Sequence, residues 1–227
     1  MNKVRFVVAS RASREQFFER TATGRSLRPY AFPFLEIRLF PENRVGLPRL
    51  YNAVIEESRA DPCMLVFAHD DLHILDYYWV ERLAAGLQRF QIIGLAGNKR
   101  RVARQPSWAF VDARLTWDQP EHLSGLVGHG QGFPPSNLSY FGPPGQQVKL
   151  LDGLLLCASS TTFIEHDLRF DERFDFHFYD MDLCRSAEQK GISCGTWPLS
   201  LIHESGGSYG SAAWQASYAK YLEKWGE

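Results

Sequence analysis

Short apolar-rich segments recur along the first hundred residues, at positions 4–9, 63–68 and 92–96. Polar or turn-forming residues close each of them, and these are Ser10-Arg11, His69-Asp70-Asp71 and Gly97-Asn98. Short apolar runs that end in this way are typical of strands buried on both faces of a sheet. The pattern therefore predicts three buried strands in this half of the chain.

Two stretches between these segments have the spacing of one helical face. Apolar residues recur there at i, i+3, i+4 and i+7, namely Leu47, Leu50, Tyr51 and Val54, and then Val80, Leu83, Ala84 and Leu87. Pro48 suits the first turn of the earlier helix, because a proline there removes no intrahelical hydrogen bond. The alternation of strands with helices predicts an α/β fold, with a mostly parallel sheet flanked by helices.

The second half of the chain has a less regular pattern. Residues 125–145 contain six glycines and four prolines, which predicts a long surface loop. Residues 148–158 resume as a strand interrupted at Asp152-Gly153, and residues 182–189 predict a short helix that ends near Gly191. Residues 212–225 have helical composition. Because no linker separates two cores, we expect a single domain over residues 1–227 with an irregular second half.

The composition is that of a globular protein, with 44% hydrophobic and 22% charged residues, and it excludes a disordered chain. Lys and Arg number 25 and Asp and Glu number 26, so the formal net charge is −1. Without an overall basic field we expect no nucleic acid partner, although residues 99–104 leave a local basic patch open. No apolar run is long enough for a transmembrane segment or a signal peptide, so we expect a cytoplasmic protein.

The four cysteines, Cys63, Cys157, Cys184 and Cys194, show no C-x-x-C spacing. Their apolar or mixed surroundings predict buried, reduced thiols. A disulfide framework is disfavoured because a chain of this size has so few cysteines. A structural zinc site is disfavoured because ligand pairs at finger spacing are missing.

The first candidate for chemistry is His69-Asp70-Asp71, directly after the second predicted strand. Ligands bind at the carboxyl ends of strands in open α/β sheets. Two adjacent carboxylates repel each other unless a cation or hydrogen-bond donors compensate them, and a divalent metal prefers oxygen ligands of this kind. The alternative is a solvated turn in which Asp70 caps the next segment.

Aromatic and acidic residues alternate densely over residues 170–184. A carboxylate at a helix start beside an aromatic wall is a candidate general base, because partial burial raises its basicity. Asp180 and Asp182 are the candidates here. The alternatives are a polar surface stretch, or acids that only cap the following helix.

His203 follows an apolar segment and leads into Gly206-Gly207. Neutral imidazole is a good metal ligand, so this histidine is a candidate for a metal site. The alternative is a structural role at the end of a strand.

In this order, the motifs resemble family 2 glycosyltransferases with the GT-A fold, particularly a subgroup similar to a streptomycin-biosynthesis protein. The resemblance runs from Val4 to about Tyr209. It rests on Asn43-Arg44-Val45-Gly46-Leu47 with Tyr51-Asn52-Ala53, on residues 69–71 in place of D-x-D, on Phe170-Asp171-Glu172-Arg173-Phe174 with Tyr179-Asp180-Met181-Asp182-Leu183, and on His203 with Gly207-Ser208. One departure is His69, which stands where the family carries its first D-x-D acid.

The resemblance implies an inverting transferase that moves a sugar from a nucleoside diphosphate donor to an acceptor hydroxyl. It implies a divalent cofactor, Mn²⁺ or Mg²⁺, which offsets the charge of the departing diphosphate. The implied metal ligands are Asp71 and His203, with Asp70 sharing the metal or the ribose. The implied base is Asp180, with Asp182 as the alternate.

The resemblance also assigns a nucleotide-sugar site. Residues 1–105 form the implied nucleotide-binding half and residues 106–227 the implied acceptor-binding half. The implied contacts of the donor are Ser10, Arg11, Asn43, Asn52, Asp70, Trp108, Asp152 and Gly153. The alternative for Arg11 is a solvated position on the surface without a ligand. The alternative for Trp108 is a purely structural role in packing.

Two other functions compete with this one. The first is a GT-A-like module that binds a nucleotide or glycan without transfer, which the histidine at position 69 motivates. The second is a metal-dependent phosphoester hydrolase or nucleotidyltransferase. It is disfavoured because the acidic motifs lie over a hundred residues apart and no P-loop pattern is present. The sequence leaves the donor base, the sugar and the acceptor open.

Overall fold

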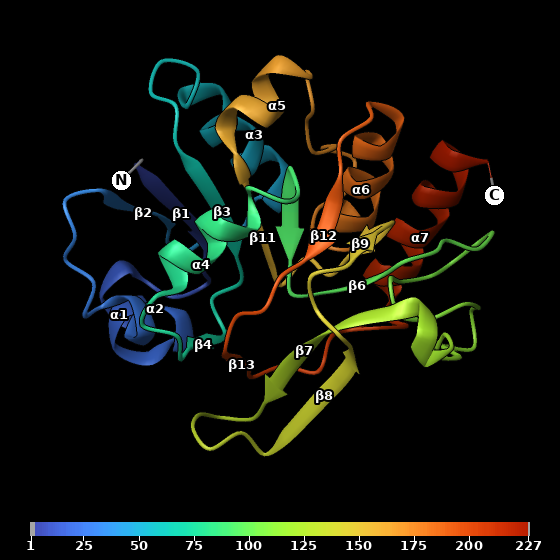
Figure 1. Ribbon diagram of the computed structural model, residues 1–227, viewed down its shortest axis with the longest axis horizontal. Helices are drawn as coiled ribbons and strands as arrows, with labels where there is room; N and C mark the ends of the chain where they lie inside the picture. The colour runs from blue at the N-terminus through green and yellow to red at the C-terminus, as the bar shows by residue number, and fades with distance from the viewer. Residues whose placement is uncertain (1–2, 227) are drawn as a thin grey trace.

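The computed structural model describes residues 3–226. Its main sheet has seven strands, which are β1 (Val4–Ala9), β2 (Leu35–Phe40), β3 (Met64–Ala68), β5 (Ile92–Gly94), β9 (Gln147–Val148), β11 (Leu155–Ser159) and β12 (Cys194–Thr196). They lie in the order β2-β1-β3-β11-β5-β12-β9, as Figure 1 shows for most of them. The predicted strands at 4–9 and 63–68 correspond to β1 and β3 within one residue.

The α/β prediction is confirmed, and the sheet is mixed, not purely parallel. β1 runs parallel to β2 and β3, and β12 runs parallel to β5. β11 is antiparallel to both of its neighbours, and its first residue, Leu155, pairs with Ala68 at the end of β3. The chain thus enters β11 from the edge at which β3 ends, which reverses the direction of this strand.

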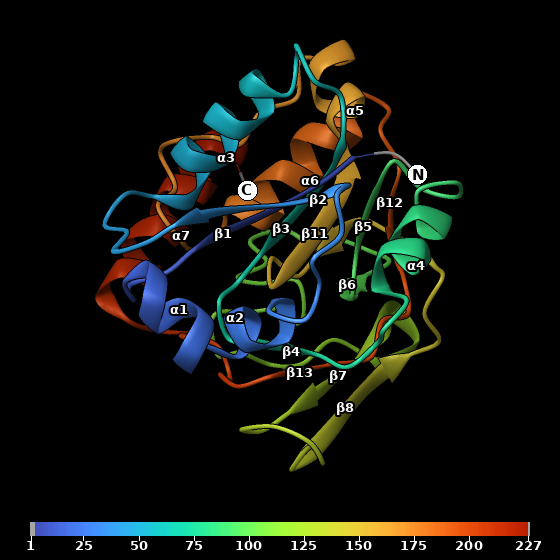
Figure 2. The ribbon, with the colours of Figure 1, turned by 90° about the vertical axis from the view of Figure 1, so that its left-hand side faces the viewer.

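A second sheet lies below the main one in the views of Figures 1 and 2. Its strands are β4 (Leu72–Ile74), β6 (Ala96–Asn98), β7 (Leu123–His129), β10 (Leu150–Leu151) and β13 (Leu201–His203), with β8 (Asn137–Gly142) paired to β7. Since β4 follows β3 after three residues, this sheet begins at the carboxyl end of the central strands. The two sheets together therefore surround that end.

The prediction of a long loop over residues 125–145 was wrong, because β7 and β8 form an antiparallel hairpin there. The glycines serve a close approach of backbones. Gly125 has a φ of +114°, and a Cβ at this position would lie 2.1 Å from the carbonyl oxygen of Leu95. The register shifts between Gly125 and Leu126, so the glycine marks an irregularity within a strand.

Helices cover both faces of the main sheet. They are α1 (Arg14–Arg20), α2 (Ala22–Leu27), α3 (Leu47–Glu57), α4 (Trp79–Gly86), α5 (Ser160–Glu165), α6 (Tyr179–Gln189) and α7 (Ala212–Trp225), with a short 3-10 turn at Pro120–His122. Figure 2 shows α4 on the face opposite to α3, α5 and α6. α3 and α4 follow the predicted helical faces, and α7 has the predicted bounds.

The sequence pattern gave no prediction for α1, α2 and β2. A local signal for α1 was present, since the side chain of Ser13 accepts a hydrogen bond from the Gln16 amide while Gln16 bonds back to the Ser13 amide. Such a capping box marks a helix start.

Aromatic rings fill the core between the main sheet and helices α3 and α5. Phe67 of β3 lies 4.5 Å from Tyr51 and 5.2 Å from Phe170, measured between ring centroids, and it also contacts Phe163. All four cysteines are free and buried, as predicted. No helix in the described part of the chain is long and apolar enough to cross a membrane.

We expect Phe67→Ala to lower the free energy of unfolding by about 3–5 kcal/mol, because it removes a ring from this aromatic core. Urea denaturation measures the change. Tyr77→Ala is the matched control, since Tyr77 is 84% exposed, and it should change the stability by less than about 0.5 kcal/mol. Equal losses in the two variants would contradict this assignment of the core.

Candidate active site

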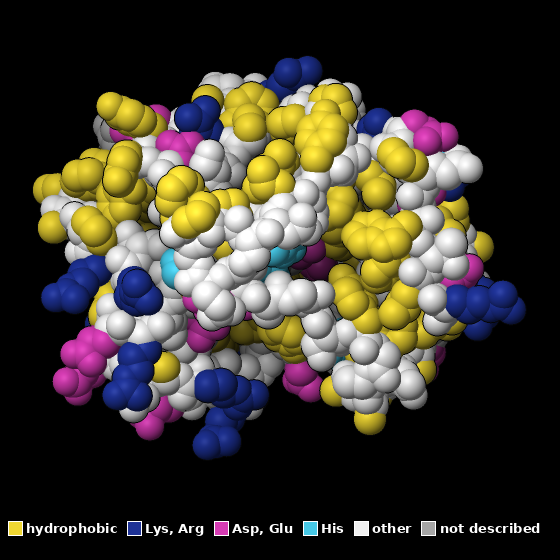
Figure 3. Space-filling view, turned by 90° about the horizontal axis from the view of Figure 1, so that it is seen from below, with side chains coloured by type: hydrophobic (Ala, Val, Ile, Leu, Met, Phe, Trp, Pro, Cys, Tyr) yellow, Lys and Arg dark blue, Asp and Glu magenta, His cyan; other side chains and the backbone are white. Residues whose placement is uncertain are grey.

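A cavity of about 650 Å³ lies where the carboxyl ends of β3 and β13 meet the start of α6. Residues 106–110 and the hairpin of β7 and β8 contribute further walls. Figure 3 shows a hollow in the lower face of the molecule, with His and acidic side chains inside it and hydrophobic side chains beside it. Segments from both halves of the chain therefore meet at one site.

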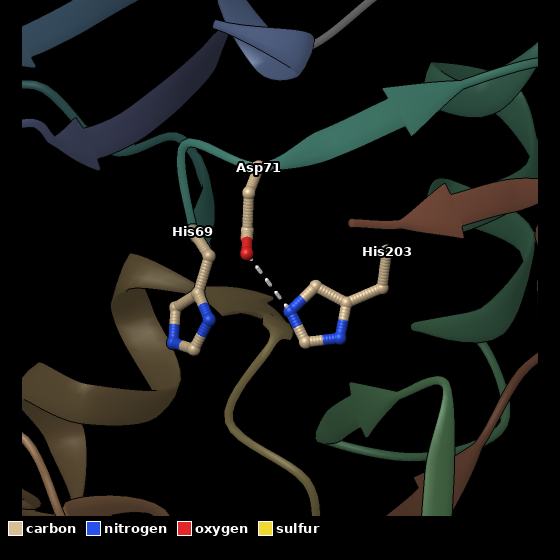
Figure 4. A group of neighbouring side chains, drawn as sticks. All are labelled: His69, Asp71 and His203. Atoms are coloured by element: carbon tan, nitrogen blue, oxygen red, sulfur yellow. Dashed lines mark ion pairs between the residues drawn. The ribbon is translucent and has the colours of Figure 1, made fainter. Parts of the chain in front are cut away.

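Three side chains in this cavity converge as a candidate metal-binding group: His69, Asp71 and His203. One nitrogen or oxygen of each lies within 4.8 Å of the others (Figure 4). His69 and Asp71 directly follow β3, and His203 ends β13. Pairing between β13 and β4 brings them together, because His203 pairs with Leu72 and the Glu204 amide donates to the carbonyl of Asp71.

The carboxylate of Asp71 is the negatively charged member of this group, and His203 is its partner. Burial disfavours a charge on Asp71, but its contact with His203, 3.3 Å from Oδ2 to Nε2, holds the pKa of Asp71 well below its usual range. Burial likewise opposes protonation of His203, yet Asp71 raises the pKa of this histidine. The other carboxylate oxygen of Asp71, Oδ1, is buried without a hydrogen-bond partner.

His69 completes the group as a neutral imidazole, because burial lowers its pKa. Its ring stacks on Phe176, and its Nε2 lies 3.3 Å from the hydroxyl of Tyr179. That hydroxyl donates its hydrogen to the carbonyl of Gly153 at 2.7 Å, so it accepts from His69 Nε2. This arrangement leaves the lone pair of His69 on Nδ1, and two imidazoles with one carboxylate fit a divalent metal.

Asp180 lies in the first turn of α6 with both carboxylate oxygens bonded to backbone. Oδ2 accepts from the Gly153 amide and Oδ1 from the Met181 amide, each at 2.9 Å. Burial, together with the nearby charge of Asp152, raises the pKa of Asp180 to about 7. A carboxylate with this pKa suits a general base near neutral pH.

Gly153 allows this geometry because it has no side chain. A Cβ at position 153 would lie 2.5 Å from the Tyr179 hydroxyl and 3.0 Å from the Cβ of Asp180. The neighbouring Asp152 accepts from the indole nitrogen of Trp108 at 2.7 Å and from the Leu154 amide at 2.9 Å. The strand break at residues 152–153 therefore brings the carboxylate of Asp152 and the backbone amide of Gly153 to the cavity.

The cavity holds a marked excess of negative charge. Four carboxylates line it, those of Asp70, Asp71, Asp152 and Asp180. None of its described lining residues is Lys or Arg, and four histidines line it, namely His69, His129, His177 and His203. An anionic ligand such as a diphosphate therefore needs a cation beside it to bind here.

The structure places the other predicted site residues in different surroundings. Asp70 lies outside the group of His69, Asp71 and His203, since its carboxylate accepts a hydrogen bond from Ser10, and burial raises its pKa. Arg11 is exposed and does not line the cavity. Asn43 and Asn52 also lie outside the lining and bond to backbone, Asn43 to Val45 and Asn52 to Phe170.

Asp182 is not brought to the cavity either. It is fully buried against α7, where Oδ1 lies 2.7 Å from the ammonium of Lys224 and accepts from the indole of Trp225. The structure thus gathers Asp70, Asp71, Trp108, Asp152, Gly153, Asp180 and His203 around one cavity. The basic cluster at residues 99–104 lies elsewhere, with Arg100 paired to Asp118 and Arg101 to Glu188.

Sequence reasoning missed several residues of the site. His69 was read as a departure from an acidic motif, although its two-residue spacing from Asp71 at a strand end was a signal for a ligand pair. Tyr179 was named only as part of a motif, without a role for its hydroxyl, and the ring of His129 and the aromatic residues Trp117 and Phe141 had no local signal. They reach the cavity only through the tertiary fold.

Comparisons with known proteins identify the fold. No family model and no curated protein matches the sequence. The crystal structure of GalNAc-T7 with UDP, GalNAc and Mn²⁺ aligns with 98% of this chain and 48% of that chain, at a TM-score of 0.60 and 12% identity. The chain has a GT-A-like fold.

This GT-A-like chain spans about half the length of the GalNAc-T7 chain. Crystal structures of TarS from S. aureus align less well, over 89% of this chain, with a TM-score of 0.48 for one and of 0.49 for residues 1–349 in complex with UDP. The sequence identities are 11% and 10%, and the two alignments cover 37% and 60% of the respective TarS chains. The resemblance to a streptomycin-biosynthesis subgroup stays a prediction.

We expect the metal-binding group to select Mn²⁺ over Mg²⁺ and Ca²⁺, because imidazole ligands favour transition metals over hard cations. Isothermal titration calorimetry of the whole chain with each ion measures this. Loss of a residue that only hydrogen-bonds to a metal ligand weakens metal binding by roughly 10–100-fold. Asp71→Asn removes a ligand itself, so it should weaken Mn²⁺ binding by at least that factor.

The matched control for this experiment is His166→Ala, since His166 is exposed and lies outside the cavity. It should leave Mn²⁺ affinity unchanged. Equal affinity for Mn²⁺ in Asp71→Asn and in the unaltered protein would show that these side chains hold no metal.

Proposed function

We propose that this protein is a metal-dependent glycosyltransferase that moves a sugar from a nucleoside diphosphate donor to an acceptor hydroxyl. One observation carries the proposal: a group that fits a divalent metal and a carboxylate with a pKa of about 7 share a cavity whose described lining residues include no Lys or Arg. The GT-A-like fold supports it, as do the UDP, GalNAc and Mn²⁺ in the GalNAc-T7 structure.

The reaction couples one bond formed to one bond broken. The acceptor oxygen attacks the anomeric carbon from the face opposite the leaving group, so the configuration inverts. The bond from this carbon to the diphosphate oxygen breaks, and the nucleoside diphosphate departs with the electron pair. Asp180 takes the proton of the acceptor hydroxyl, which is a poor nucleophile until it loses that proton.

His69, Asp71 and His203 would hold the metal. When bound there, a divalent cation supplies the positive charge that offsets the negative charge of the departing diphosphate. The hydroxyl of Tyr179 contributes by orienting His69, because it fixes the proton of that ring on Nε2. The backbone amides of Gly153 and Met181 orient the base, because each donates a hydrogen bond to the Asp180 carboxylate.

Donor binding follows from the same arrangement. Asp70 lines the cavity just after β3 and suits contact with the nucleoside. Ser10 is buried and does not line the cavity, and its hydroxyl donates a hydrogen bond to the Asp70 carboxylate. Trp108 and Asp152 suit contact with the sugar, since an indole bonded to a carboxylate offers a flat face beside a hydrogen-bond acceptor. Asp182 is left out of this assignment because it faces Lys224.

A module that binds the nucleotide without transfer is the alternative. The reason for considering it was that His69 stands where the family has an acid. Because His69 lies within the metal-binding group, its presence is compatible with metal binding and gives little support to this alternative. The raised pKa of Asp180, a carboxylate that lines the cavity, is the feature that supports catalysis over binding alone.

We expect Asp180→Asn to reduce sugar transfer by about 10²–10⁴-fold, because the acceptor loses its base. Binding of a nucleoside diphosphate in the presence of Mn²⁺ should persist. Release of nucleoside diphosphate in the presence of acceptor measures transfer, and calorimetry measures binding. Asp167→Asn is the control, since the Asp167 side chain is 88% exposed. Unchanged turnover in Asp180→Asn would reject the base, and nucleotide binding without any turnover in the unaltered protein would favour the binding module.

The activity should depend on pH through Asp180. Only the ionised carboxylate accepts a proton, and its pKa is raised to about 7, so kcat/KM should fall as the pH drops below 7 and level off above it. Because the charge of Asp152 contributes to this pKa, Asp152→Asn should move the midpoint of the profile to lower pH. A flat profile between pH 5 and pH 8 would contradict the assignment.

A further inference from the structure

Five aromatic side chains form a continuous wall of the cavity: Trp108, Phe110, Trp117, Phe141 and Tyr209, here called the aromatic wall. Trp117 stacks on Phe141, with ring centroids 5.8 Å apart and planes 22° apart. Phe141 meets Trp108 edge-on at 4.9 Å, and Phe110 meets Trp117 and Tyr209 edge-on at 4.9 and 5.1 Å. Every member touches another, so the wall is one surface.

The aromatic wall connects the candidate base to the open side of the cavity. At its inner end the indole of Trp108 donates to Asp152, whose charge acts on Asp180. At its outer end Trp117 is 55% exposed, whereas Trp108 is 5% exposed. A ligand that lies along the wall therefore reaches from solvent to the carboxylate that takes the acceptor proton.

The exposed ring of Trp117 is held in place. Residues 110–117 form a closed loop, in which Phe110 and Trp117 make an isolated bridge and the Val111 amide donates to the Thr116 carbonyl at 2.9 Å. The next residue, Asp118, is buried and bonded to Asn98 at 2.8 Å and to Arg100. A platform that is rigid before binding loses little conformational entropy when a ligand stacks on it.

The chemistry of the wall points to a sugar ring. A saccharide presents a face of C–H groups, which packs on flat aromatic rings, and a rim of hydroxyls, which needs hydrogen-bond partners. The cavity supplies such partners beside the rings, in the carboxylates of Asp152 and Asp180 and in the Ser139 side chain. A purely apolar acceptor would bury these polar groups without partners, at a cost in free energy.

The negative charge of the cavity limits the chemical class of the acceptor further. Four carboxylates and no Lys or Arg occur among the lining residues within positions 3–226. An acceptor that carries a carboxylate or phosphate would be repelled by these acids and by the negative faces of the aromatic rings. We propose that the acceptor is a neutral saccharide that stacks on Trp117 and Phe141 and presents its hydroxyl to Asp180. This inference rests on the proposed function.

The test uses the whole chain with Mn²⁺ and a panel of UDP-hexoses, and it measures UDP release above the rate without acceptor. The probes are neutral disaccharides, a disaccharide that carries a uronic acid, a Ser/Thr peptide and decanol. Neutral disaccharides should accelerate release, and the other three probes should not. Trp117→Ala should raise the acceptor KM by about tenfold, with a smaller effect on kcat, because ground-state stacking is lost.

Two further variants separate stacking from general damage. Trp117→Phe should restore most of the acceptor affinity, since it keeps a flat ring. Tyr140→Ala is the matched control, because Tyr140 is 63% exposed on the hairpin next to Phe141 and does not line the cavity. Its acceptor KM should equal that of the unaltered protein.

The outcomes distinguish this inference from the proposed function. If UDP-hexoses turn over with Mn²⁺ but neutral disaccharides never accelerate release, the saccharide assignment is overturned while the transferase stands. Acceleration by the peptide, the acidic disaccharide or decanol alone also overturns it, as do equal KM values in Trp117→Ala and Tyr140→Ala. If the protein neither binds UDP with Mn²⁺ nor turns over any donor of the panel, the proposed function itself fails for this donor class.

Discussion

The shortage of positive charge in the cavity is the constraint on which the rest of the site depends. Four carboxylates face one space, and the described residues around it offer only histidines in return. Burial and mutual repulsion raise the pKa values of Asp70 and Asp180, whereas Asp71 stays ionised because His203 contacts it. The same imbalance accounts for the fit to a divalent metal and for the raised pKa of Asp180, and it is the basis of the proposed neutral acceptor.

The fold supports this concentration of charge through backbone geometry. The ends of β3 and β13 are held together by pairing between β4 and β13, which fixes His69, Asp71 and His203. The start of α6 is fixed at Phe178, which has a φ of +68° although it is not a glycine. Rings of Trp214, Tyr218 and Tyr221 on α7 pack against Phe178 and hold this conformation.

Local patterns in the sequence predicted the parts of the fold that depend on local physics. The apolar run of β1 and the helical composition of α7 gave their bounds, and the polar residues that end β3 and β13 gave Asp71 and His203. The hairpin of β7 and β8 was missed because its glycines serve close backbone contacts, Gly125 with Leu95 outside the hairpin and Gly142 with Leu123 across it, which no local pattern shows. Trp117 was missed for a similar reason, since its place at the cavity depends on the turn that Asp118 anchors.

Helix geometry explains why the sequence left two candidates for the base and the structure keeps one. Residues two positions apart on a helix point in directions roughly 200° apart, so Asp180 and Asp182 cannot both face the cavity. Asp180 faces it, and Asp182 binds Lys224 and Trp225 of α7. That ion pair ties α7 to α6, and α7 in turn packs on Phe178 at the start of α6. Asp182 therefore helps to position Asp180, the proposed base.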